Sequence, residues 1–252
     1  MPDHEVTAVI LAAGVARRLA PLTDNTQKSL LPVGGRPMLG RMLEALHGVG
    51  VRRVAIVVGH CADQVATLAA SAPPGMAVEL VHNPAYQKGS ALSLLCARET
   101  IARGPVLIMD ADVVFPREFL RRLTGLSAGN ALLVDRGFAD TGEEVKIYTL
   151  EDRVIALGKK VVPPAWDGVG EGIGFFRCGP EAGPELLRLL ERVIDLSQGL
   201  CEYEDALHLL VSRHRVEAVD VTGLPWTEVD FAEDLRRAQL EVFPEIVRLE
   251  GA

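Results

Sequence analysis

The sequence lacks the long apolar runs and the excess of basic side chains that mark two large classes of protein. No stretch approaches the ~20 apolar residues that a membrane-spanning helix needs, and the acidic residues that follow Met1 differ from the basic start of an export signal. We therefore expect no membrane insertion. The 252 residues carry a net charge of -8, whereas a nucleic acid needs a basic face to bind. We therefore expect no nucleic-acid partner.

Paired cysteines are also missing. Cys61, Cys96, Cys178 and Cys201 are scattered singly along the chain, whereas zinc sites and dithiol redox sites need cysteines at short, regular spacing. The spacing excludes both kinds of site, and we expect reduced thiols in a cytoplasmic protein.

Two well-known phosphate-binding loops are absent. A Walker loop requires a glycine directly before its lysine, but Gln27 precedes Lys28 here. A dinucleotide-binding fingerprint requires three glycines at fixed offsets, but Gly14 stands alone. Any phosphate site in this chain must therefore use a different loop.

The N-terminal region contains a buried strand that ends in small residues. Residues 6 and 8–11 are apolar and partly β-branched, which predicts a strand buried on both faces. The small residues after it let a bulky anion approach backbone N–H groups, and Arg17, Arg18 and Lys28 follow to neutralise its charge. A phosphate-rich ligand fits this chemistry. The predicted nucleotide-binding loop consists of Leu11, Ala12, Ala13, Gly14 and Val15.

Residues 11–39 resemble the signature of the nucleotidyltransferases that activate sugar phosphates and phosphorylated alcohols. That signature is approximately LAAGxGxRLxPLTxxxPKxLLPVxGxPML, and the chain has LAAGVARRLAPLTDNTQKSLLPVGGRPML. Ala16 replaces the second glycine and Gln27 replaces the proline before the lysine, but neither change removes a charged group. The matching residues are Gly14, Arg18, Leu19, Pro21, Leu22, Thr23, Lys28, Leu31, Pro32, Val33, Gly35, Pro37 and Met38.

Further along, buried strands alternate with amphipathic helices up to about residue 125. This alternation predicts an α/β fold with a Rossmann-like, doubly wound, mostly parallel mixed sheet flanked by helices. After it, strands follow one another, which predicts a smaller antiparallel part that binds the acceptor. We expect one domain, residues 1–252, with a nucleotide-binding half at about 1–125 and an acceptor-binding half at about 126–252. Strands are predicted at 54–58, 78–81, 106–109, 131–134, 145–150, 154–157, 173–177 and 216–221, and helices at 38–46, 62–70, 90–98, 181–196, 203–213 and 232–240.

A polar loop at residues 83–93 precedes one of these helices. The resemblance places recognition of the nucleotide base here, and Gln87, Ser90 and the backbone at Gly89 supply donors and acceptors. A solvated helix cap at Ser90 is the alternative explanation.

Two carboxylates follow the predicted strand 106–109. Asp110 and Asp112 stand at the C-terminal end of a parallel strand, where open α/β sheets bind their ligands. Mg²⁺ prefers oxygen ligands of this kind. The resemblance assigns the metal to Asp112, and we assign Asp110 to orienting the nucleotide. Capping of a helix near Pro116 is the alternative for both.

The second half offers basic groups and a glycine-dense run. The resemblance implies a strand lysine that binds the acceptor phosphate; Lys159 matches it best and Lys146 is the next candidate, although a solvated lysine is the default for either. The run 168–174 precedes a predicted strand rather than a helix, which excludes a dinucleotide role. We interpret it as a close backbone approach to a ligand, with Glu171 projecting into the site.

The segment Trp-Thr-Glu-Val-Asp at 226–230 resembles an element of the phosphocholine cytidylyltransferases and their relatives. The resemblance implies that Asp230 is a second metal ligand beside Asp112 and that Mg²⁺ is the cofactor. Capping of the helix predicted at 232–240 is an alternative role for Asp230. A choline headgroup needs aromatic walls and a counter-charge, but only 5% of the residues are aromatic. Predicted acceptor contacts are Tyr86, Glu171, Trp226 and Glu228, with Trp166 and Tyr203 as further possible walls.

The resemblance implies transfer of a cytidylyl group from CTP to a small phosphorylated alcohol or phosphonate, with phosphocholine as the leading example. Arg18 and Lys28 then stabilise the triphosphate, and Lys159 or Lys146 orients the acceptor. A hexose-1-phosphate nucleotidyltransferase or a molybdopterin-type relative is the runner-up. A catalytically silent nucleotide-binding paralogue is a third possibility, to which Ala16 and Gln27 give slight support. The sequence leaves the oligomeric state open.

Overall fold

A mixed sheet forms the centre of the molecule. The computed structural model describes residues 6–126 and 129–251, and in this part of the chain the sheet has nine strands in the order β5-β4-β1-β6-β11-β8-β12-β10-β9. Short ribbons pair β2 with β3 and β7 with β13. The strands are β1 (Thr7–Ala12), β2 (Pro32–Val33), β3 (Arg36–Pro37), β4 (Arg53–Val58), β5 (Ala77–His82), β6 (Val106–Asp110), β7 (Val113–Val114), β8 (Asn130–Asp135), β9 (Lys146–Leu150), β10 (Arg153–Gly158), β11 (Gly168–Cys178), β12 (Val216–Asp220) and β13 (Thr227–Glu228).

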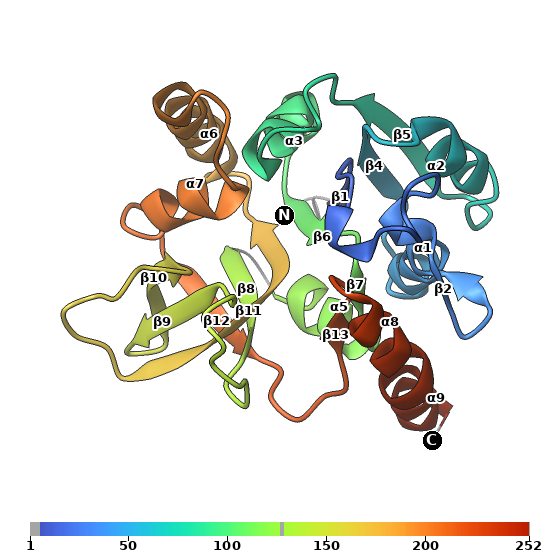
Figure 1. Cartoon of the computed structure of the whole chain (residues 1–252). Helices are drawn as coiled ribbons and strands as arrows, with labels where there is room; N and C mark the ends of the chain where they lie inside the picture. Colours follow the sequence, from blue (N-terminus) through green and yellow to red (C-terminus); the bar gives the residue numbers. More distant parts are fainter. Residues whose placement is uncertain (1–5, 127–128, 252) are drawn as a thin grey trace.

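Helices cover both faces of this sheet. The helices are α1 (Met38–Gly48), α2 (Ala62–Ala69), α3 (Ser90–Cys96), α4 (Arg98–Arg103), α5 (Glu118–Thr124), α6 (Gly183–Ser197), α7 (Tyr203–Leu210), α8 (Ala232–Arg237) and α9 (Phe243–Gly251). One face packs against α3, α4, α6 and α7, and the other against α1, α2 and α5. The C-terminal helices α8 and α9 form a separate cluster with Leu19, Leu31 and Val33. Figure 1 shows β4 and β5 at one end of the sheet, and β9 and β10 at the other.

The first half has the predicted parallel arrangement. Strands β4, β1 and β6 run parallel to one another, and β5 is parallel to β4. Central positions such as Val9, Ile10 and Ile108 are fully buried because helices lie over both faces. The predicted doubly wound α/β fold is therefore confirmed.

The second half is mixed rather than purely antiparallel. Strand β11 runs antiparallel to β6 and β8, and β9 pairs antiparallel with β10 and β11. However, β12 is parallel to β8. Helices α6 and α7 lie between β11 and β12 in the chain and connect two strands that run in opposite directions on either side of β8.

The glycine-dense run is part of a strand, which corrects the predicted strand start at residue 173. Glycines are present because β11 lies very close to its neighbours β8 and β6. A Cβ at Gly170 would lie 2.3 Å from Val134, and one at Gly174 would lie 2.2 Å from Asp110. The close approaches at these two positions are therefore to the chain's own residues. Gly174 also has φ +73°, where the strand register shifts between Gly172 and Phe176.

Two predicted helices are interrupted in the structure. The helix predicted to run through Arg98 is divided at Ala97 into α3 and α4. The helix predicted at 232–240 becomes α8, a π-helical turn at Ala238–Val242, and then α9. Pro244 has no N–H to donate to Leu240, so the regular helical ladder is interrupted next to the π turn.

Within the described ranges, no helix is both long enough and apolar enough to cross a membrane.

Substitution of alanine for Gly174 and for Gly40 should have opposite effects on the free energy of unfolding. Gly174→Ala should lower the free energy of unfolding by about 2–3 kcal/mol, because the new Cβ clashes with Asp110 at a positive φ. Gly40→Ala, inside α1 with its Cβ in ordinary contact 3.7 Å from Leu68, should raise it by about 0.5–1 kcal/mol. Urea denaturation measures both values, and equal effects would contradict the assigned backbone constraint.

Candidate active site

A large cavity and a smaller pocket meet near the C-terminal ends of β1 and β6. The large cavity has a volume of about 550 Å³ and lies mainly between β6, β11 and α7; the small pocket has about 230 Å³ and lies over the loop after β1. Asp110 and Asp112 line both. The two spaces therefore share a wall at the position where open α/β sheets bind their ligands.

Backbone pairing brings two remote acidic residues together at this wall. Strand β7 follows Asp112 and pairs with β13, which ends two residues before Asp230. The N–H of Val229 donates to the carbonyl of Asp112 at 3.0 Å. Carboxylate oxygens of Asp112, Glu228 and Asp230 consequently lie within 4.8 Å of one another. The close approach of Asp112 and Asp230 is thus confirmed, and Glu228 lies beside them.

Lys28 sits between the two aspartates. Its Nζ lies 2.5 Å from Asp112 Oδ2 and 2.7 Å from Asp230 Oδ1. Burial alone would lower the pKa of Lys28, but the two carboxylates raise it well above its ordinary value. Burial would raise the pKa of Asp230, but Lys28 and Arg18 lower it. Lys28 is therefore a permanent cation at this point of the site.

Arg18 completes the basic side of the cluster. Its Nη1 lies 3.1 Å from Asp230 Oδ2, and its guanidinium lies over the ring of Phe231, 5.4 Å from the centroid. With its side chain 53% exposed, Arg18 remains accessible to a ligand in the large cavity.

The donor set fits a magnesium ion. Asp112 Oδ1 is buried and has no hydrogen-bond partner among the described residues, which is costly for a carboxylate oxygen unless a ligand satisfies it. Asp112, Asp230 and Glu228 supply oxygen ligands of the type that Mg²⁺ prefers. Burial, together with Asp112 and Asp230, raises the pKa of Glu228 to about 8. This crowding of negative charge is what a divalent cation would relieve.

The capping alternatives do not fit the observed contacts. Asp234 accepts the N–H groups of Asp230 and Phe231 at the start of α8, while the Asp230 carboxylate binds Lys28 and Arg18. Asp110 accepts a hydrogen bond from the hydroxyl of Tyr203 at 2.8 Å. The side chains of Asp110 and Asp230 therefore face the site rather than a helix terminus.

The two departures from the family signature preserve the loop geometry. The Gln27 amide donates to the carbonyl of Ala12 at 2.7 Å, and its Oε1 accepts the N–H of Ser29 at 2.5 Å. Gln27 thereby fixes the turn at Lys28 against the end of β1. Ala16 adopts φ 51°, ψ 50°, a left-handed conformation that glycine favours. Its carbonyl accepts the hydroxyl of Thr23 at 2.9 Å, so the alanine is held where a glycine is expected.

The predicted nucleotide-binding residues divide into those that line the small pocket and those that do not. In the described structure Leu11, Ala13, Gly14, Ser90 and Asp110 line it, together with Tyr86 and Lys28. Gln87 is exposed outside it. Val15 is also outside the lining, and the carbonyl of Ala12 binds Gln27. A Cβ at Gly89 would lie 1.8 Å from the carbonyl oxygen of Cys201, so Gly89 permits a close contact between two chain segments.

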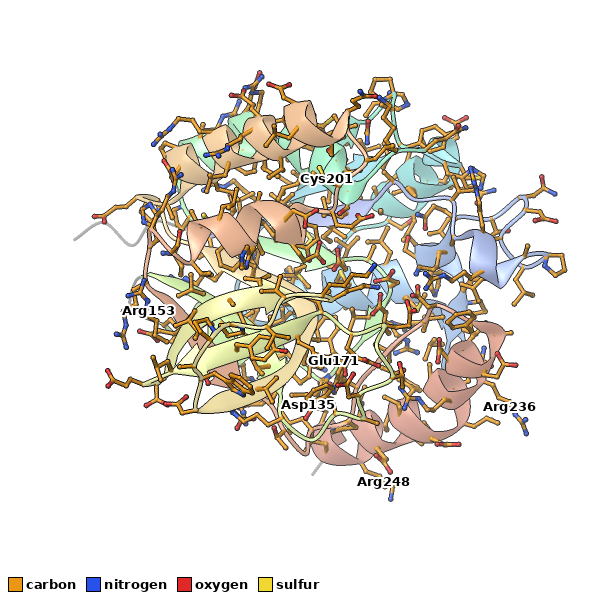
Figure 2. All side chains as sticks on the ribbon, turned by 60° about the vertical axis from the view of Figure 1, so that its left-hand side comes forward. Asp135, Arg153, Glu171, Cys201, Arg236 and Arg248 are labelled. Carbon is orange, nitrogen blue, oxygen red and sulfur yellow. The ribbon has the colours of Figure 1, made fainter. Side chains whose placement is uncertain are left out.

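The predicted acceptor residues divide in the same way. Lys159, Glu171 and Glu228 line the large cavity. Lys146 is absent from its described lining and binds Asp140 Oδ2 at 2.7 Å. Trp226 is also absent from that lining and donates from Nε1 to Asp135 Oδ2 at 2.8 Å. Tyr86 lines the small pocket instead. Figure 2 shows Glu171 next to Asp135, its register partner on β8.

Of the possible aromatic walls, Tyr203 lines the large cavity, whereas Trp166 packs edge-on against Tyr148 outside the described lining. Glu204, which follows Tyr203 on α7, also lines the cavity and was not predicted. The sequence predicts an amphipathic helix at 203–213, and α7 buries Leu207 and Leu210 on its apolar face. Glu204 lies three residues before Leu207 and so borders that face, which is a signal present in the sequence.

These features define a nucleotidyltransferase site, and the family comparison agrees. Residues 8–145 match the family model described as MobA-like NTP transferase domain. This is more than half of the chain, and the chain belongs to that family. The resemblance inferred from the signature at residues 11–39 is confirmed.

The chain is similar to two longer proteins over nearly its whole length. It is 32% identical over 250 residues to the bifunctional IPC transferase and DIPP synthase of Rubrobacter xylanophilus, covering 95% of this chain and 54% of that protein. It is 32% identical over 254 residues to the CMP-5'-(3-aminopropyl)phosphonate synthase of Streptomyces rubellomurinus, covering 95% of this chain and 39% of that protein. The chain thus spans about half the length of these relatives, or less.

A solved structure has the same fold. The inositol-1-phosphate CTP transferase from T. maritima aligns with a TM-score of 0.76 at 20% identity, and the alignment covers 96% of each chain.

Glu171 predicts a pH-dependent stability. Burial, with Glu144 and Asp135 nearby, raises its pKa to about 7. The folded state therefore disfavours the ionised form of Glu171. Its contribution lowers the free energy of unfolding progressively as pH rises from about 4 to 7, and this contribution stays constant above pH 7. Glu171→Gln should stabilise the protein by about 1–2 kcal/mol more at pH 8 than at pH 5, measured by urea denaturation.

The matched control for this experiment is Glu143→Gln. Glu143 lines the same cavity with a side chain 71% exposed, so its substitution should change stability by less than about 0.5 kcal/mol at either pH. An equal pH dependence for both variants would refute the desolvation of Glu171.

Proposed function

We propose that the chain transfers a cytidylyl group from CTP to a small phosphorylated alcohol or phosphonate, giving a CDP-alcohol or CMP-phosphonate and pyrophosphate. The observation that carries this proposal is the cluster of Asp112, Asp230 and Lys28 at the wall shared by the two spaces. A triphosphate in the small pocket and an acceptor in the large cavity would meet at this wall.

The choice of CTP and of the acceptor class is supported by one relative in particular. The Streptomyces protein is named as a CMP-phosphonate synthase and is similar to 95% of this chain. Phosphocholine is one candidate acceptor within the class. A hexose 1-phosphate is the competing acceptor, since the same family fold serves several nucleotidyltransferases.

The chemistry needs positioning and charge neutralisation. A phosphate or phosphonate oxygen of the acceptor attacks the α-phosphorus; a new P–O bond forms while the bond to the bridging oxygen of the β-phosphate breaks, and pyrophosphate leaves. The attacking group is already anionic near neutral pH, so no general base is required. Lys28 and Arg18 stabilise the negative charge of the triphosphate and the leaving pyrophosphate, and Lys159 holds the acceptor.

Asp112 and Asp230, with Glu228 beside them, are the proposed ligands of Mg²⁺. When bound, this ion supplies positive charge to the phosphate oxygens. All four cysteines are free thiols in the structure, and we retain the cytoplasm as the proposed compartment.

The decisive experiment measures pyrophosphate release from the four common ribonucleoside triphosphates with Mg²⁺ and a set of acceptors. CTP with an alcohol phosphate or phosphonate should give the highest kcat/KM. Activity with hexose 1-phosphates alone would favour the competing function. A lack of turnover with every combination, despite nucleotide binding, would favour the silent paralogue.

Removal of either aspartate should abolish most of the activity. Asp112→Asn and Asp230→Asn should each lower kcat at least about 100-fold, because each removes a charged group from the reacting centre. Asp195→Asn, on the exposed surface of α6, is the matched control and should leave kcat unchanged. A steady-state assay at saturating Mg²⁺ measures all three, and full activity of either site variant would exclude the proposed metal ligands.

The two candidate lysines can be separated kinetically. Lys159→Gln should raise KM for the acceptor about 10- to 100-fold, with little change in KM for CTP, because it removes a charge-assisted hydrogen bond to the acceptor. Lys146→Gln should have the smaller effect on the acceptor, since Lys146 is bound to Asp140 outside the cavity. The opposite order would assign the acceptor phosphate to Lys146.

A further inference from the structure

One carboxylate in the large cavity has a buried oxygen without a partner. Glu204 lies in the first turn of α7, next to Tyr203, whose hydroxyl binds Asp110. Among the described residues, Glu204 Oε2 has no hydrogen-bond partner, and no basic side chain lies within ion-pair distance of Glu204. A buried carboxylate oxygen without a hydrogen-bond partner is unfavourable, so its presence in a cavity wall points to a ligand group that donates to it.

The charge of the cavity as a whole points to a cationic ligand group. Nine carboxylate side chains and three basic ones are found among the described residues that line it. An acceptor phosphate or phosphonate alone would meet mostly like charge there. Even with Asp112, Glu228 and Asp230 assigned to the proposed metal site, six carboxylates face three basic side chains, so a cationic group on the acceptor would improve the balance of charge.

Building on the proposed function, we infer that Glu204 recognises a protonated amine on the acceptor, which is a small aminoalkyl phosphate or aminoalkylphosphonate. The phosphorus group faces Lys159 at the wall shared by the two spaces, and the ammonium group donates hydrogen bonds to Glu204. Apolar side chains such as Leu157, Phe176 and Leu207 line the same cavity and suit a short alkyl chain between the two charged ends.

The unpartnered atom, Glu204 Oε2, determines which kind of amine can bind. A carboxylate oxygen is an acceptor and needs an N–H or O–H donor. A quaternary ammonium such as choline has a positive charge but no N–H, and a polyol has O–H donors but no charge. An ammonium with N–H groups satisfies both requirements at once. Burial raises the pKa of Glu204 to about 7, and a bound cation would offset that cost of the ionised form.

Lys159 is the alternative partner for Glu204. Its Nζ lies 3.7 Å from Glu143 Oε2, and its side chain is 47% exposed. A lysine with this freedom could turn to Glu204 and neutralise it without any ligand. In that case Glu204 would position Lys159 and would influence every acceptor to the same degree.

The test compares acceptors that differ in one group. Pyrophosphate release with Mg²⁺ and CTP is measured for 2-aminoethyl phosphate, phosphocholine, 2-hydroxyethyl phosphate and ethyl phosphate, with the intact chain and with Glu204→Gln. Wild-type protein should prefer 2-aminoethyl phosphate to 2-hydroxyethyl phosphate by roughly 10- to 100-fold in kcat/KM. Glu204→Gln should remove most of this preference and leave kcat/KM for ethyl phosphate within about threefold.

Glu143→Gln is the matched control, because it removes the same charge from the exposed rim of the cavity. It should preserve the ratio between amine and hydroxyl acceptors, and thermal denaturation checks that both variants fold. Equal rates for the four acceptors, or an equal loss for all of them in Glu204→Gln, would overturn the inference.

Failure of the proposed function has a separate signature. If no acceptor is turned over with any nucleotide, isothermal titration calorimetry of 2-aminoethyl phosphate with the protein still decides. Binding that Glu204→Gln weakens at least tenfold supports amine recognition at Glu204, whereas absence of binding to the wild-type chain overturns it.

Discussion

The site depends on one short backbone pairing. Strand β7 lies directly after Asp112, and β13 lies just before Asp230, so their ladder and the bond from Val229 N–H to the Asp112 carbonyl bring the two carboxylates to one point. Two carboxylates this close repel each other unless a cation lies between them. Lys28 supplies that cation from the turn after β1, which Gln27 holds in place. The backbone pairing thus brings Asp112 and Asp230 together, and the ion pairs with Lys28 offset their repulsion.

The charged centre of the site could be predicted from the sequence because its residues belong to long motifs. Arg18 and Lys28 stand in the signature at residues 11–39, and Asp112 and Asp230 follow or precede strands with distinctive flanking residues. The structure brings all four together. Most of the parallel half of the sheet was equally predictable, since β1, β4 and β6 contain continuous apolar runs separated by amphipathic helices.

The wall of the large cavity was less predictable because its residues depend on tertiary contacts. Trp226 and Lys146 are suitable in chemical type for a ligand, but they bind Asp135 and Asp140 of the protein itself. No local pattern indicates such a partner before the strands are paired. Glu204 shows the opposite case. It lies on a helix whose apolar stripe predicts packing, and only the position of α7 beside β10 places it in a cavity. Contacts formed across elements are predictable only where each partner stands in a recognisable motif, as Asp112 and Asp230 do.

Strand β11 restricts how the two halves of the sheet can move against each other. Its first part pairs with β9, and its last part pairs with β6, so a single uninterrupted stretch of backbone belongs to both halves. A rotation of one half against the other would require rupture of main-chain hydrogen bonds along this stretch, at a cost that ordinary thermal motion does not meet. In the proposed reaction, the distance between the phosphorus atoms of the two substrates would therefore depend largely on the sheet, and any adjustment on substrate entry would fall to the loops that line the cavity.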